Sequence, residues 1–86
     1  MARYTQRQAA YLTFIYFYTA VHGRPPAEHE FLRRFKVSGP AVHQMIVTLT
    51  RNELITREPY VPRSIRLNLD RDELRELLGM FALEQV

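Results

Sequence analysis

The apolar positions in the first third of the chain repeat at helical spacing. Thr5-Gln6-Arg7-Gln8 has the form of a capping box, which predicts a helix from there to about Val21. Gly23 is expected to end this helix, and Pro25-Pro26 prevent its continuation. The inward-facing aromatic and leucine residues of 28–35 then predict a short second helix.

A third helix is predicted over about residues 39–52. Ser38 is a favourable N-cap, and Pro40 in the first helical turn costs no hydrogen bond, because that N–H has no partner in a helix. The apolar stripe of this helix consists of Val42, Met45, Ile46 and Leu49. Two helices joined by a turn of three or four residues form a helix-turn-helix.

After the third helix, apolar and polar positions alternate with a period of two residues. Residues 54–58 and 64–69 alternate as strands do, and the proline-containing segment 59–63 predicts a loop, so we expect a two-stranded hairpin, or wing. Asp70-Arg71-Asp72-Glu73 is a second capping box and predicts a fourth helix. The apolar stripe of that helix consists of Leu74, Leu77, Leu78 and Phe81.

The predicted fold class is mainly α with a small β-hairpin. Residues 1–69 are interpreted as a winged helix-turn-helix domain, and residues 70–86 as an extra C-terminal helix for packing or dimerisation. A chain of 86 residues has room for one small domain. The sequence has no cysteine, no apolar run of the ~20 residues that a membrane helix needs and no signal-peptide pattern, so we expect a cytoplasmic protein.

Charge is distributed unevenly along the chain. Residues 1–66 carry ten basic and four acidic residues, whereas residues 67–86 carry two basic and five acidic ones. All but one of the basic residues are arginine, whose guanidinium binds phosphates and base edges in a forked geometry. A basic body therefore favours a polyanionic partner, although a solvated surface with chance asymmetry fits the same composition.

The segment from Tyr4 to Leu67 resembles the DNA-binding domain of the LexA repressor family, a winged helix-turn-helix. The matching landmarks fall in register without gaps: Thr5-Gln6-Arg7-Gln8, Gly23-Arg24-Pro25-Pro26, Ser38, Leu49-Thr50-Arg51, Leu54-Ile55 and Arg63-Ser64-Ile65-Arg66-Leu67. The resemblance implies sequence-specific binding of double-stranded DNA and regulation of transcription, as by a repressor. These 86 residues hold nothing like the family's serine–lysine peptidase domain, so self-cleavage is not implied.

The chain departs from the family pattern where that family reads DNA. Ala27 stands where the family has a Thr or Ser cap, and the turn before the third helix lacks the frequent glycine. The base-reading positions hold Pro40, Ala41, His43 and Gln44 in place of Asn or Ser followed by Glu. Ser64 stands where the family often has Gly. We therefore expect a target sequence different from the family's usual operator.

The second helix of a helix-turn-helix enters the major groove, which assigns candidate contacts. Base reading is expected from Ser38, Ala41, His43 and Gln44. Contacts to the DNA backbone are expected from Arg7, Arg24, Arg33, Arg34, Lys36, Thr48 and Arg51. At the wing, Arg63 is expected to enter the minor groove or pair with phosphate, and Tyr60 to pack on the sugar–phosphate surface. An ordinary solvated surface is the alternative for the residues of the helices, and packing within the loop is the alternative for Tyr60.

The sequence predicts no chemistry beyond binding. His22, His29 and His43 fall in different predicted elements, so we expect no metal site. The chain has neither a glycine-rich phosphate loop nor a Gly-x-Ser-x-Gly motif, so we expect no enzyme, cofactor or small-molecule substrate.

The first helix has no charged residue between Arg7 and Arg24 and is apolar on both faces. One face packs on the predicted core, so another surface must bury the second face. The fourth helix either folds back on it or meets it across a two-fold axis. We favour a homodimer with an interface of Tyr16, Phe17, Leu74, Leu77, Leu78 and Phe81. The alternative function is a winged-helix module for protein–protein contact, in which this face binds another protein and DNA plays no part.

Overall fold

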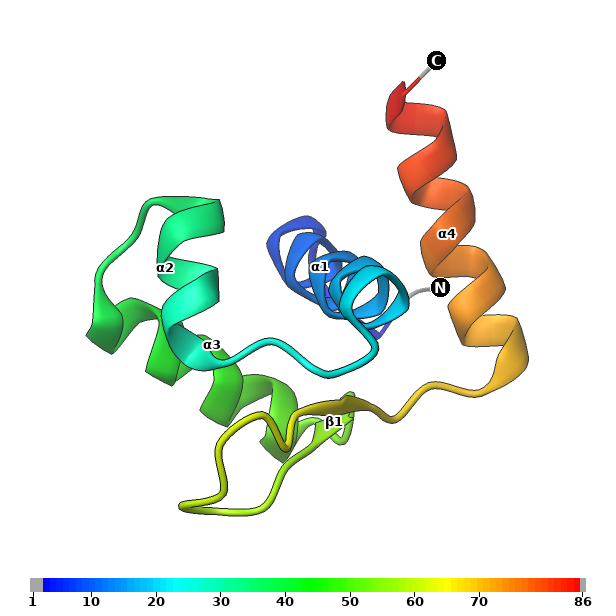
Figure 1. The fold of residues 1–86 in the computed structure, drawn as a ribbon. Coiled ribbons are helices and arrows are strands. Elements are labelled where there is room, and N and C mark those ends of the chain that lie inside the picture. The colour runs from blue at the N-terminus through cyan, green and yellow to red at the C-terminus, as the bar shows by residue number, and fades with distance from the viewer. Residues whose placement is uncertain (1–2, 86) are drawn as a thin grey trace.

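The computed structural model describes residues 3–85, with side chains up to residue 80. The elements follow in the order α1 (Gln6–His22), α2 (Glu28–Phe35), α3 (Gly39–Arg51), β1 (Ile55–Thr56), β2 (Arg66–Leu67) and α4 (Arg71–Gln85). Figure 1 shows α1 at the centre, with α2 and α3 on one side, α4 on the other and the hairpin below. The prediction of a mainly helical chain with a small antiparallel hairpin is confirmed.

Local hydrogen bonds fix the helix starts that the sequence predicts. The backbone N–H of Gln8 donates to Thr5 Oγ1 at 3.1 Å, and the N–H of Thr5 donates to Gln8 Oε1 at 2.9 Å. Asp70 and Glu73 exchange the same pair of bonds, at 2.8 and 3.1 Å, at the start of α4. Ser38 caps α3 through its hydroxyl oxygen. Such bonds satisfy N–H groups that have no partner inside a helix.

The helix α2 has weaker ends than its neighbours. Ala27 offers no side-chain acceptor at the N-cap, and only the return bond forms, from the Ala27 N–H to Glu30 Oε1 at 3.3 Å. At the other end Lys36 adopts a left-handed conformation with φ of 54°, which glycine adopts without steric cost. A lysine thus occupies a backbone conformation that residues other than glycine rarely adopt.

The hairpin is shorter than the predicted strands 54–58 and 64–69. Only two residue pairs form the ladder, Ile55 opposite Leu67 and Thr56 opposite Arg66. The remaining residues, 57–65, form the hairpin loop, in which Tyr60 and Arg63 have φ of 65° and 56°. Beyond the ladder, the Glu58 N–H and carbonyl bond to the Ser64 hydroxyl and not to the backbone of an opposite strand.

One apolar core joins the helices and the hairpin. Its buried members are Ala9, Tyr11, Leu12, Ile15, Phe31, Val42, Ile46, Leu49, Leu54, Ile55, Ile65 and Leu77. The faces predicted for α1, α2 and α3 supply most of these side chains. The sequence pattern did not assign Phe14, whose ring packs edge-on against Phe31 at 5.0 Å and Phe35 at 5.8 Å between centroids.

The helix α4 packs against α1 of the same chain. Leu77 is 0% exposed, and Ala9, on the α1 face that the sequence left uncovered, is buried as well. Arg3 Nε lies 2.7 Å from Glu73 Oε2 and ties the start of the chain to α4. Leu77 is therefore part of the core of its own chain, and the prediction that it lies in a dimer interface is wrong for this structure. Tyr16, Leu74 and Leu78 are half-buried, Phe17 is 39% exposed, and the side chain of Phe81 lies outside the described residues.

Over the described residues, none of the helices combines the length and the apolar character needed to cross a membrane.

Candidate nucleic-acid interface

The N-terminal half of α3 presents its polar side chains to solvent while its apolar stripe is buried. Ala41, His43 and Gln44 are exposed. The oxygen of Ser38 accepts the Ala41 N–H at 3.2 Å, so its hydroxyl hydrogen remains as a donor. Thr48 Oγ1 donates to the Gln44 carbonyl at 2.9 Å. The expected base-reading residues therefore share one end of one firmly anchored helix.

Glu28 bridges this face of α3 and the hairpin loop. Its Oε1 lies 3.6 Å from His43 Nδ1, and its Oε2 accepts a hydrogen bond from Arg57 Nη1 at 3.4 Å. Sequence reasoning missed both Glu28 and Arg57. Strand alternation put Arg57 on the same side as the buried Ile55, so the pattern gave no sign of a cation beside α3.

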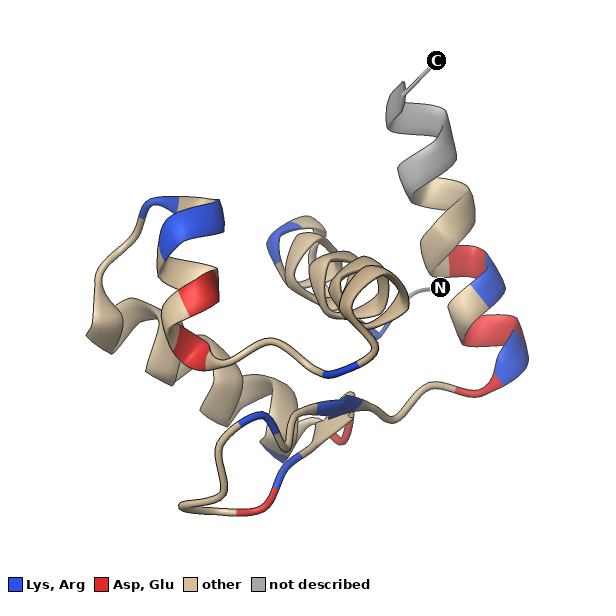
Figure 2. Cartoon of the chain, in the orientation of Figure 1, with Lys and Arg blue, Asp and Glu red and all other residues tan. Residues whose placement is uncertain are grey.

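Four cations gather near Phe35, at the C-terminal end of α2. The guanidinium carbons of Arg7 and Arg34 lie 5.8 and 5.2 Å from the centroid of the Phe35 ring, and Arg33 and Lys36, which are next to Arg34 and Phe35 in sequence, are exposed. Figure 2 shows the acidic residues of α2 at the opposite end of that helix. Stacking on a ring orients a guanidinium without neutralising it. This cationic cluster is therefore suited to phosphate groups.

The structure does not bring the other predicted backbone contacts into the cationic cluster. Arg24 follows α1 at the end remote from Arg7. Arg51 closes α3 at the end remote from the Ser38 cap. Both are exposed, and their contact with DNA stays a prediction.

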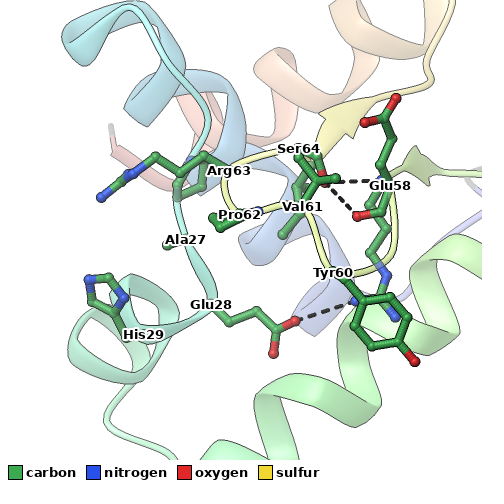
Figure 3. A pocket seen from close by; sticks show the side chains of 12 residues that line it. Ala27, Glu28, His29, Glu58, Tyr60, Val61, Pro62, Arg63 and Ser64 are labelled. Carbon is green, nitrogen blue, oxygen red and sulfur yellow. Dashed lines mark hydrogen bonds and ion pairs between the residues drawn. The ribbon is translucent and has the colours of Figure 1, made fainter.

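Arg63 does not point outward from the hairpin loop. Its Nη1 lies 2.6 Å from Glu30 Oε1 and donates to Tyr18 Oη and the Pro25 carbonyl, each at 3.2 Å. Figure 3 shows its guanidinium directed away from the ring of Tyr60. Glu30 therefore neutralises the charge of Arg63 in this structure, and the contact of Arg63 with DNA stays a prediction that this arrangement does not favour.

The Glu30 carboxylate is strongly stabilised in its charged form. Burial acts to raise the pKa of Glu30, but hydrogen bonds from Tyr18, the Ala27 N–H and Arg63, together with the charge of Arg63, lower it to about 2. The pKa of Arg63 is raised, chiefly by its hydrogen bond with Tyr18; burial acts in the opposite direction, and the hydrogen bond and charge of Glu30 add to the rise. The ion pair therefore persists at neutral pH.

The tip of the hairpin loop is apolar. Tyr60 is fully exposed and Val61 is 48% exposed. Between this loop and the start of α2 lies an open hollow of about 350 Å³, whose lining mixes Pro26 and Ile65 with charged groups (Figure 3). Ser64 Oγ in its wall is engaged with the backbone of Glu58, from which it accepts at 2.9 Å and to which it donates at 3.1 Å.

Among the residues that the structure describes, no three His, Asp or Glu side chains gather as a metal site. Neither a model of a known protein family nor a curated protein matches the chain.

Proposed function

We propose that the protein is a winged helix-turn-helix regulator of transcription, of the repressor type, that binds specific sequences in double-stranded DNA. One observation carries this proposal: the exposed polar half of α3 sits on a buried apolar stripe, Glu28 links its His43 to Arg57 of the hairpin loop, and cations stand at the end of α2 that precedes it. A helix anchored in this way fits the major groove, with phosphate contacts on one side and a hairpin on the other.

The cationic cluster supplies the sequence-independent part of the binding. If each of Arg7, Arg33, Arg34 and Lys36 neutralises one phosphate, the logarithm of the binding constant falls with the logarithm of salt at a slope of about −3.6. Gln44 and His43 supply the sequence-dependent part, since a glutamine amide matches the hydrogen-bonding edge of adenine and an imidazole N–H can donate to guanine.

Selection of bound duplexes from a random pool, followed by salt titration, tests the proposal. We expect one enriched motif and a steep salt dependence on both selected and random DNA. Enrichment of no motif would remove the sequence-specific function. Failure to bind any duplex at low salt would remove DNA binding altogether.

A second candidate function, protein–protein contact, is favoured by the second half of α1. An apolar hollow of about 260 Å³ there is lined by Ile15, Tyr16, Ala20 and residues of β2, and Val21 nearby is 76% exposed. The homodimer expected from the sequence stays a proposal centred on this face and on Tyr16, Phe17 and Leu78. Sedimentation equilibrium of Ala20→Arg, with the exposed Ala10→Arg as matched control, tests it. A wild type that is monomeric at all concentrations contradicts it.

A further inference from the structure

Arg63 joins the hairpin loop to three other parts of the chain. Its guanidinium reaches Tyr18 in the last turns of α1, the Pro25 carbonyl between α1 and α2, and Glu30 in the first turn of α2. The side chains of Arg63 and Glu30 are only 28% and 15% exposed. A single side chain thus fixes the hairpin loop against the body of the molecule on the side away from α3.

The hairpin loop needs such a contact because few hydrogen bonds between the two strands hold its backbone in place. The ladder has two residue pairs. Beyond it, the Glu58 N–H donates a hydrogen bond to the Ser64 hydroxyl, and the Val61 N–H donates one to the Glu58 carbonyl at 3.1 Å. Tyr60 and Arg63 hold left-handed φ values that residues other than glycine rarely adopt. Such conformations persist only where surrounding contacts impose them.

The charge of Arg63 is not available to DNA, whereas the tip of the hairpin loop is. Glu30 neutralises the guanidinium at 2.6 Å, while Tyr60 is fully exposed at the other end of the loop. We propose that Arg63, Tyr18 and Glu30 are positioning residues, which hold the hairpin loop so that Tyr60 touches DNA while α3 occupies the groove. This inference rests on the proposed function and assigns Arg63 an indirect role.

The test compares Arg63→Met and Tyr18→Phe with Arg66→Met, which removes an exposed arginine from β2 of the same hairpin. Hydrogen exchange of the Val61 N–H is measured without DNA, with core amides as the check on folding. We expect at least tenfold faster exchange at Val61 in Arg63→Met, a smaller increase in Tyr18→Phe and no change in Arg66→Met. Tyr18→Phe removes one hydroxyl only and keeps the test valid if Arg63→Met unfolds.

DNA binding of the same variants then separates positioning from direct contact. We expect Arg63→Met to weaken binding about tenfold with an unchanged salt slope, because its charge faces Glu30, whereas loss of a phosphate contact lowers the slope by about 0.9. Tyr60→Ala should weaken the wild type and have no further effect in Arg63→Met.

Three results would overturn the inference while the proposed function stands: unchanged exchange at Val61 in both Arg63→Met and Tyr18→Phe, a salt slope reduced by about 0.9 in Arg63→Met, or additive effects of Arg63→Met and Tyr60→Ala. A wild type that binds no duplex overturns the proposed function itself, and with it the role of Tyr60, whatever the exchange shows.

Discussion

Acidification should remove the stabilising contribution of Glu30. Its pKa is lowered from 4.5 to about 2 in the folded chain, a difference equivalent to about 3 kcal/mol at neutral pH. Solvent on the open side of the carboxylate reduces the expected contribution to about 1–2 kcal/mol. A carboxylate whose folded pKa is depressed stabilises the fold above its unfolded pKa. That stability is lost as the pH falls from about 5 toward 2.

Urea unfolding of the wild type and Glu30→Gln at pH 7, 4 and 2.5 measures this contribution directly. The variant should be less stable by about 1–2 kcal/mol at pH 7, and the difference should shrink toward zero at pH 2.5, where Glu30 of the wild type is increasingly protonated. Other carboxylates titrate equally in both proteins and cancel. Glu76→Gln, an exposed residue of α4, is the control and should show no such trend. A constant difference between wild type and Glu30→Gln across this range would refute the assignment of the low pKa to Glu30.

Three further predictions follow from the structure. Gln44→Ala should cost about 1–3 kcal/mol on the selected duplex and little on random DNA, whereas Arg33→Ala should weaken both equally; equal losses for Gln44→Ala would contradict the docking of α3. Leu77→Ala should lower the free energy of unfolding by about 2–4 kcal/mol in chemical denaturation, because a fully buried leucine is truncated, while Arg75→Ala should change it by less than about 0.5 kcal/mol. Lys36→Gly should raise thermal stability by about 0.5–1 kcal/mol by relieving the left-handed backbone, and should still bind DNA with a salt slope about 0.9 shallower; a destabilised variant would contradict the first half.

The features that sequence predicted well depend on neighbouring residues. The capping boxes at Thr5 and Asp70 and the cap at Ser38 involve residues three positions apart, and the helical periods follow from the same short range. The exposed position of Gln44 follows from the period of α3. These elements need no knowledge of the rest of the chain.

The features that sequence missed depend on distant partners or on backbone conformation. The partner of Arg63 is Glu30, 33 positions away, and no periodic pattern marks such a pair. The hairpin loop begins early because the Ser64 hydroxyl bonds to the N–H and carbonyl of Glu58, a contact between side chain and backbone that strand alternation does not reveal. From the sequence, α4 could either fold back on α1 of its own chain or meet α1 of a second copy. The burial of Leu77 against α1 favours the first arrangement.

The ring of Phe35 links the cationic cluster to the core. It stacks on Tyr11 with centroids 4.3 Å apart and planes 6° from parallel, while Arg7 and Arg34 lie over it. Tyr11 is buried in a chain without tryptophan, so no indole absorption masks the tyrosine band. Near-ultraviolet circular dichroism therefore reports the packing of the five tyrosines, and Tyr11→Phe would isolate the part that comes from the ring beside Phe35.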